Sequence, residues 1–273
     1  MPIKCFEQVR AIEQEDFHQI DKRVMRVAFD VHNEFGRFLD ESLFQEEIAS
    51  RCRFRGLTTT REMRIRVTHE DFKKEYEVDL LVENGVVVEM KTVEILSPVH
   101  EAQLLNYLFL TGTQFGSLIN LGSTSVKRRF VSTSMTPNDR RQLQVVDVDW
   151  HPIVPQFVSF RERMMTLLQD WGACLELNIY RDGMVHFLGG ADKVIKTIPI
   201  CSQSRIIGRQ KVHIFADDFA FLITALRKGQ DAMREHQSRF LSHTELRGIA
   251  WINLNGQTAE FRTVSNNNND FAL

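Results

Sequence analysis

Residues 78–91, VDLLVENGVVVEMK, contain the pattern that decides the fold of the first half of this chain. Two apolar, β-branched runs flank Asn84-Gly85, and Asn-Gly between such runs is the strongest short-range signal for a β-hairpin. The pattern predicts two antiparallel strands joined by a tight turn. Side chains alternate across a strand, so Glu89 and Lys91 share one face of the second strand and Met90 points to the other.

Three charged residues, Asp79, Glu89 and Lys91, interrupt these otherwise apolar strands. Buried carboxylates and ammonium groups are costly unless they pair with an opposite charge or bind a metal ion. One interpretation is an ion pair at the end of a sheet. The other is a metal site, in which Asp79 and Glu89 offer hard oxygen ligands to Mg²⁺ while Lys91 orients or activates a water molecule or steadies a phosphoryl oxygen.

The segment that follows adds a second motif. Ser97-Pro98 has loop chemistry, and the residues after it have the pattern of an amphipathic helix. Gln103 and Tyr107 lie four residues apart and therefore share one face of that helix. Residues 117–121 then predict a buried strand, and residues 126–131 predict a basic strand.

An acidic residue, a hairpin with E-x-K and a helix with Q-x-x-x-Y together resemble the PD-(D/E)XK nuclease superfamily. Residues from about 20 to 132 are similar to the GxxExxY family, a bacterial family placed in that superfamily. At the naming motif, Phe38 and Phe44 stand at the Gly and Tyr positions and only Glu41 is retained. The collinear segments that carry the resemblance are VHNEFG (31–36), LDESLF (39–44), VDLLV (78–82), VEMK (88–91), PVHEAQLLNY (98–107) and LINLG (118–122).

The resemblance implies an αβββαβ core, a mixed sheet flanked by helices, and a set of active-site residues. In this set Asp79, Glu89 and the backbone carbonyl near Met90 hold Mg²⁺ or Mn²⁺, Lys91 acts on the attacking water, Gln103 positions Lys91 or a base, and Tyr107 and Glu41 support the rim. For Glu41 a second explanation stays open, because a carboxylate in the first turn of a helix is favoured by the helix dipole. Phe44 in place of Tyr keeps the packing but removes a hydroxyl group, which affects substrate contacts more than metal binding.

The rest of the pattern predicts two domains, a nuclease-like domain of residues 1–145 and a C-terminal α/β lobe of residues 146–273 without catalytic residues. Residues 132–155 are rich in proline and charge and are predicted to connect them. The predicted elements are helices at 16–35, 39–54, 157–170 and 231–241, strands at 58–67, 76–82, 86–92, 211–215, 219–226, 249–254 and 259–264, a hairpin at 175–188 around Asp182-Gly183, and a disordered tail at 266–269.

The second lobe repeats part of the first. Glu101-Ala102-Gln103 followed by LINL (118–121) is mirrored by Glu235-His236-Gln237 followed by WINL (251–254). If the second lobe is a degenerate copy of the same fold, Glu89 and Lys91 project onto Thr224 and Leu226, which can neither bind a metal nor transfer a proton. Its expected roles are packing, an added DNA-binding surface or formation of a homodimer.

Composition limits the classes of protein. The chain has 273 residues, 43% of them hydrophobic, which excludes wholesale disorder. With 34 Lys and Arg against 36 Asp and Glu, any surface that binds nucleic acid must be local. The 4 Cys residues lie far apart without C-x-x-C pairs, so neither a zinc site nor a disulfide framework is indicated. No apolar stretch approaches the roughly 20 residues of a membrane helix, so we expect a soluble, cytoplasmic protein.

These observations predict a metal-dependent nuclease that hydrolyses phosphodiester bonds in DNA, or in RNA, by endo- or exonucleolytic cleavage. The alternative is a catalytically inactive nuclease fold that acts as a nucleic-acid-binding or assembly module. An unrelated α/β interaction module with an ordinary ion pair between Asp79 and Lys91 is the third option. The complete set of charged residues favours the active enzyme, because loss of function would first remove the charges that are costly to bury.

Overall fold

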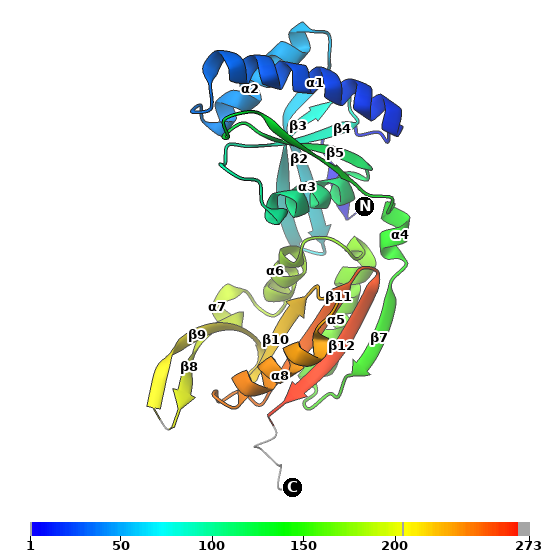
Figure 1. Cartoon of the computed structure of the whole chain (residues 1–273). Helices are drawn as coiled ribbons and strands as arrows, with labels where there is room; N and C mark the ends of the chain where they lie inside the picture. The colour runs from blue at the N-terminus through cyan, green and yellow to red at the C-terminus, as the bar shows by residue number, and fades with distance from the viewer. Residues whose placement is uncertain (1, 204, 267–273) are drawn as a thin grey trace. The chain divides into compact units, whose positions relative to one another are not determined.

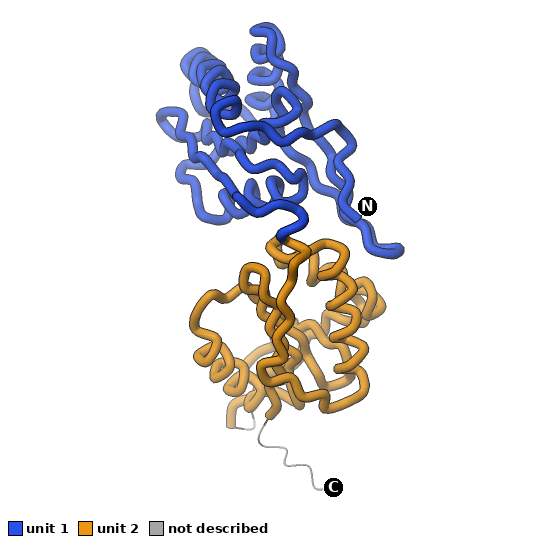
Figure 2. Tube along the Cα trace, turned by 90° about the vertical axis from the view of Figure 1, so that its right-hand side faces the viewer, with its two compact units in different colours: residues 1–139 blue, residues 140–273 orange. Residues whose placement is uncertain are grey.

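The structure is a computed structural model that describes residues 2–203 and 205–266. The chain divides into two compact units, Met1–Asp139 and Arg140–Leu273 (Figure 2). Each unit contains a six-stranded mixed sheet flanked by helices (Figure 1), which is the predicted fold class. Residues 267–269 of the predicted tail lie outside the described residues. In the described part, no helix combines the length and the apolar character that crossing a bilayer requires.

The first sheet has the strand order β1-β2-β3-β4-β5-β6. Only the β4–β5 pair is parallel, and the helix α3 makes the crossover between these two strands. The elements of this unit are β1 (Ile3–Cys5), α1 (Gln14–Phe35), α2 (Glu41–Phe54), β2 (Thr59–His69), β3 (Phe72–Val82), β4 (Val86–Lys91), α3 (Pro98–Thr111), β5 (Phe115–Asn120), β6 (Lys127–Ser132) and α4 (Pro137–Arg141), the last reaching the unit boundary.

Helices α1 and α2 cover one face of the first sheet and α3 covers the other (Figure 1). The core between α1, α2 and the sheet contains fully buried side chains, among them Phe17, Ile48 and Met90. Helix α1 ends at Gly36, as predicted. The sequence spacing predicts an inner stripe of Leu43, Phe44, Ile48 and Cys52 for α2. Phe44, Ile48 and Cys52 are fully buried, whereas Leu43 is 53% exposed.

Two features of this unit were not predicted. Strand β1 pairs antiparallel with β2, whereas the first strand predicted from the sequence begins at residue 58. The connection between the strands predicted at 58–67 and 76–82 is also shorter than expected, because β2 continues to His69 and β3 starts at Phe72. Both of these side chains are buried, and their pairing extends the hairpin to its tip.

The second sheet has the order β7-β12-β11-β10-β9-β8. Helix α5 contacts β9, α6 contacts β10 and α8 contacts β12. The elements are β7 (Gln144–Asp149), α5 (Gln156–Trp171), α6 (Leu177–Phe187), α7 (Ala191–Val194), β8 (Ile195–Ser202), β9 (Arg205–Ala216), β10 (Phe219–Thr224), α8 (Gln230–Leu241), β11 (Gly248–Asn255) and β12 (Thr258–Ser265).

The two units share a strand topology. In each, three antiparallel strands lead to a crossover helix, then to a strand parallel to the third and an antiparallel neighbour: β2-β3-β4-α3-β5-β6 and β8-β9-β10-α8-β11-β12. In the parallel pairs, Lys91 lies opposite Asn120 and Thr224 lies opposite Asn253. The helix and the strand named in the sequence echo therefore occupy corresponding positions in their own sheets.

The register corrects one detail of that echo. Since Thr224 stands opposite Asn253 as Lys91 stands opposite Asn120, the residues that match Glu89 and Lys91 are Leu222 and Thr224, not Thr224 and Leu226. Backbone hydrogen bonds between the strands set the register. The spacing in the sequence alone had placed the counterparts of Glu89 and Lys91 two residues too far along the chain. The corrected pair also lacks a carboxylate and an amine.

The predicted hairpin at residues 175–188 is wrong, because residues 177–187 form helix α6. Gly183, which suggested a turn, lies on the buried side of that helix against α5. A Cβ atom there would come within 2.7 Å of the Trp171 ring. The glycine thus permits close approach of two helices, a tertiary requirement that overrides its local preference for turns.

The predicted connection at residues 132–155 contains α4 and β7, and the boundary between the units falls after Asp139. Strand β7 pairs in parallel with β12 at the edge of the second sheet. Next to the boundary, the buried Arg140 donates to the backbone oxygens of Trp171 and Ala173 at 2.8 and 3.3 Å. Polar residues in this segment thus satisfy backbone groups of the second unit.

We predict that Gly183→Ala destabilises the protein by about 1–3 kcal/mol, because the added methyl group overpacks the contact with Trp171. In an unconstrained helix, the same change would stabilise by about 1 kcal/mol. Urea unfolding of the full chain measures the difference. The matched control is Gly208→Ala, where a Cβ atom meets nothing within 4 Å. A Gly183→Ala variant as stable as the wild type would contradict the proposed packing.

Candidate active site

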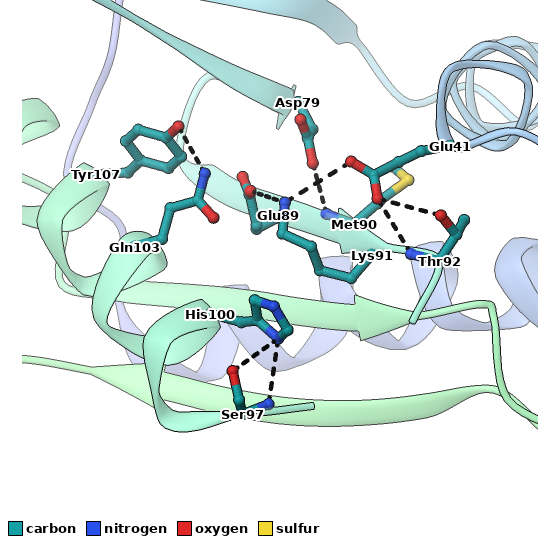
Figure 3. Close-up of polar contacts among 10 residues, drawn as sticks. All are labelled: Glu41, Asp79, Glu89, Met90, Lys91, Thr92, Ser97, His100, Gln103 and Tyr107. Carbon is teal, nitrogen blue, oxygen red and sulfur yellow. Dashed lines mark hydrogen bonds and ion pairs between the residues drawn. The ribbon is translucent and has the colours of Figure 1, made fainter. Parts of the chain in front are cut away.

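Glu89 and Lys91 lie on β4, on the face of the sheet that α3 covers, while Met90 between them packs into the core beneath α1 and α2. Glu89 is almost fully buried, with 1% of its surface exposed. The hairpin pattern and the alternation of side chains therefore gave the correct strand and the correct face for both residues (Figure 3).

Asp79 approaches the same point from the neighbouring strand β3. Its Oδ2 atom accepts a hydrogen bond from the backbone N–H of Met90 at 2.7 Å. This bond ties the carboxylate to the segment that carries Glu89 and Lys91. The structure therefore brings together the two carboxylates that the sequence suggested as metal ligands.

Lys91 lies between two carboxylates. Its Nζ atom is 2.5 Å from Oε1 of Glu89 and 3.7 Å from Oε1 of Glu41. Glu41, in the first turn of α2, also accepts a hydrogen bond from the backbone N–H of Thr92 at 3.1 Å. It thus anchors the start of α2 to the end of β4, a contact that a helix-dipole role alone does not require.

Gln103 and Tyr107 are paired on α3, where the Gln103 amide donates to the Tyr107 hydroxyl at 3.2 Å (Figure 3). The helix begins with a capping box: the Ser97 side chain accepts from the backbone N–H of His100, and the His100 side chain accepts from the backbone N–H of Ser97. The ion pairs of Lys91 are with Glu89 and Glu41. The role of Gln103 in positioning Lys91 therefore stays a prediction.

The positions that depart from the GxxExxY motif have different environments. Phe38 is 88% exposed, whereas Phe44 is fully buried in the core of the unit. Phe44 therefore contributes packing from α2. Phe38 leaves an aromatic ring at the surface near the start of the same helix.

Asn120 is a structural residue of the site that the sequence reasoning did not single out. It stands opposite Lys91 on β5, and its Oδ1 atom accepts hydrogen bonds from the N–H groups of Val93 and Gly122, both at 3.1 Å. A Cβ atom at Gly122 would come within 2.4 Å of the Thr92 backbone. The LINLG segment therefore fixes the end of the strand that carries Lys91, and the polar Asn in an apolar strand was the available signal.

The site concentrates negative charge in a buried place. Burial and the neighbouring Asp79 raise the pKa of Glu89 to about 8, and Lys91 offsets this only in part. Burial also raises the pKa of Asp79, despite the Met90 N–H donor. Burial lowers the pKa of Lys91, but Glu89 and the other carboxylates outweigh it, so the net shift is upward. The amine is therefore a stable cation facing carboxylates that resist ionisation.

A divalent cation fits this arrangement. The Oε2 atom of Glu89 is buried without a hydrogen-bond partner, and a cation between Glu89 and Asp79 would satisfy it and remove their mutual repulsion. In residues 2–203 and 205–266 no group of three or more His, Cys, Asp or Glu side chains is arranged to hold a metal ion. A metal site here would therefore use two carboxylates, with the other ligands from backbone oxygen, water or substrate.

Residues 18–131 match the sequence profile of the PD-(D/E)XK nuclease superfamily. No curated protein matches the chain. No solved structure matches it. The matched region includes all of the site residues described above and ends before the second unit, so the similarity to nucleases concerns the first unit.

We predict that Glu89→Gln raises the free energy of unfolding of the metal-free protein at alkaline pH. The carboxyl group has an ordinary pKa of 4.5, but in the folded protein the pKa is about 8. A group whose pKa is raised by folding contributes most below pH 4.5, and that contribution is lost as the pH rises through 8. Gln has no such loss, so its advantage grows over this range to about 1–3 kcal/mol.

Urea unfolding in EDTA at about pH 5 and about pH 8.5 measures this difference, with Glu77→Gln on the exposed part of β3 as the control. The control should follow the wild type at both pH values. If Glu89→Gln is only as stable as the wild type at alkaline pH, or less stable, the result contradicts the prediction. The ion pair between Glu89 and Lys91 would then stabilise the protein by more than burial of the Glu89 charge destabilises it.

Proposed function

We propose that the first unit is a divalent-metal-dependent nuclease that hydrolyses phosphodiester bonds in DNA, with RNA as the second candidate substrate. Within the PD-(D/E)XK superfamily, the retained Glu41 and the collinear segments favour the GxxExxY family. The observation that carries the proposal is the convergence of half-buried Asp79 and buried Glu89 beside Lys91, with one oxygen of Glu89 left without a partner. Such a buried carboxylate pair is costly to stability and is expected where a cation binds.

Asp79 and Glu89 would hold Mg²⁺ or Mn²⁺, and the backbone carbonyl of Met90 is proposed as a third ligand. When bound, the ion would lower the pKa of a water molecule and stabilise charge on the phosphoryl group. The Asp79 carboxylate accepts a hydrogen bond from the backbone N–H of Met90, so two of the proposed ligand residues are linked directly to each other.

Lys91 would bind a phosphoryl oxygen and orient the attacking water. Its pKa is raised by the carboxylates around it, so it remains an ammonium ion at neutral pH. A group that keeps its proton donates hydrogen bonds and does not act as a general base. Glu41 holds the other side of the ammonium group, which restricts where the three N–H donors point.

Gln103 and Tyr107 would line the substrate side of the site. They are hydrogen-bonded to each other on α3, the helix that covers the same face of the sheet as Glu89 and Lys91. A paired amide and phenol present further donors and acceptors, which suits contacts to a nucleotide. Whether cleavage begins within a strand or at its end depends on access to this rim.

The alternative is a nuclease fold without turnover that binds nucleic acid or joins an assembly, including a homodimer. The second unit is proposed to carry no catalytic residues, because Leu222 and Thr224 stand at the positions of Glu89 and Lys91. Its role in the intact protein would therefore be packing, an added DNA-binding surface or formation of a homodimer. An intact charged set in the first unit favours an active enzyme over this alternative.

We predict that millimolar Mg²⁺ or Mn²⁺ raises the melting temperature of the wild type, because a ligand that binds only the folded state stabilises it by mass action. At about 100 times the dissociation constant, the gain is about 2.7 kcal/mol. The double variant Asp79→Asn, Glu89→Gln should show no metal-dependent shift. Ca²⁺ and Na⁺ at matched ionic strength are the controls. Equal shifts in both proteins would place the bound metal elsewhere.

We predict that Lys91→Ala reduces cleavage of labelled DNA in Mg²⁺ or Mn²⁺ by at least about a hundredfold, since it removes the proposed electrostatic contact to the phosphoryl group. Lys73→Ala, an exposed lysine on β3, should retain activity. Both variants are checked by circular dichroism, so that loss of fold is separated from loss of chemistry. A Lys91→Ala enzyme that cuts at the wild-type rate excludes the mechanism, and a wild type that binds DNA without cutting it supports the binding module.

A further inference from the structure

The second unit contains a cavity of about 270 Å³ between β9, β10 and α8. This volume is close to the lower end of small-molecule sites, about 300 Å³. Its walls are largely apolar, formed by Val212, Ala220, Leu222, Phe240 and Ile249, with Gln237 as a buried polar residue among them.

The cavity lies at the counterpart of the candidate active site. It is lined by Leu222, which corresponds to Glu89 in the strand register, and by residues of α8, which corresponds to α3. Carboxylates are absent from its lining, so it lacks the hard oxygen ligands that Mg²⁺ takes. The space that holds charged residues in the first unit is apolar in the second.

Gln237 identifies the chemistry of an occupant. It is only 5% exposed, yet neither its amide nitrogen nor its amide oxygen has a hydrogen-bond partner. Leaving buried amide atoms unpaired is costly, and such groups in native proteins call for a partner. Because Gln237 lines the cavity, a ligand in the cavity can supply both the acceptor and the donor that the amide lacks.

We propose that this cavity binds an adenine base. Glutamine recognises adenine through two hydrogen bonds, from its amide nitrogen to N7 and from N6 of the base to its amide oxygen. The apolar walls and the ring of Phe240 suit a flat aromatic ligand. Lys211 and His236 also line the cavity, and both are exposed, which places an ammonium group and an imidazole where an attached phosphate would reach solvent.

Two sources of adenine share this chemistry, a free nucleotide and a base extruded from a nucleic-acid strand. The free nucleotide is independent of the nuclease proposal. The strand rests on the proposed function, since it requires that the chain engage nucleic acid. The experiment therefore uses both probes in EDTA, so that neither arm depends on cleavage.

Saturation-transfer NMR with adenosine 5′-monophosphate and the full-length wild type should show contact to the adenine protons, with weaker contact for uridine 5′-monophosphate. Gln237→Leu should weaken binding of the adenine nucleotide about tenfold or more. The same variant should melt at a higher temperature, because it replaces an unsatisfied amide by an apolar side chain of similar size. A purely structural Gln237 would give the opposite change in melting temperature. The matched control is Gln142→Leu, an exposed position in the same unit, which should change neither property.

An oligo(dA) strand that displaces the nucleotide identifies the strand as a source, and a strand that fails to compete leaves the free nucleotide as the ligand. Photo-crosslinking with 8-azidoadenosine 5′-monophosphate, followed by peptide mass spectrometry, should label β9, β10 or α8. Unchanged affinity in Gln237→Leu, equal binding of both nucleotides, crosslinks confined to the first unit, or no binding by the wild type would each overturn the proposal. None of these results alters the metal and cleavage tests of the first unit.

Discussion

The parallel pairing of β4 with β5 is the constraint on which the first unit depends. Parallel neighbours cannot be joined by a tight turn, so the chain must cross over through a helix. That helix is α3, and the crossover places Gln103 and Tyr107 over the face of the sheet that carries Glu89 and Lys91. Asn120 then holds the backbone just past the end of β4, so the position of Lys91 follows from the sheet itself.

Burial of like charges sets the balance between stability and function at this site. Asp79 and Glu89 lie on adjacent strands, in segments (78–82 and 86–90) whose other residues are apolar, and burial raises the pKa values of both carboxyl groups. Lys91 compensates for part of this charge. The rest is a cost in folding free energy that a divalent cation would remove, which links metal binding to stability as well as to chemistry.

The sequence predicted elements where local and tertiary preferences agree. The Asn84-Gly85 turn, the alternation around Glu89 and the helical spacing of α1 all depend on local geometry, and each is present. The prediction failed at Gly183, where close packing on Trp171 explains the glycine, and at β1, whose pairing with β2 has no local signal. For the site, the sequence placed Asp79, Glu89 and Lys91 together, but the anchoring of Thr92 by Glu41 depends on how α2 meets the sheet.

The correspondence between Asn120 and Asn253 explains why two units with different interiors keep one topology. Asn253 accepts a hydrogen bond from the N–H of Leu226 at 2.7 Å, two residues beyond its partner Thr224, as Asn120 does from the N–H of Val93, two residues beyond Lys91. Strands β4 and β10 each end beside a parallel neighbour. The backbone N–H just past the end of each strand needs an acceptor at that point. In both units an Asn in the neighbouring strand supplies it, although the adjacent side chains differ. The echo in the sequence is therefore strongest at a backbone requirement of the fold, while Glu89 and its counterpart Leu222 are free to differ because they face the space that the crossover helix covers.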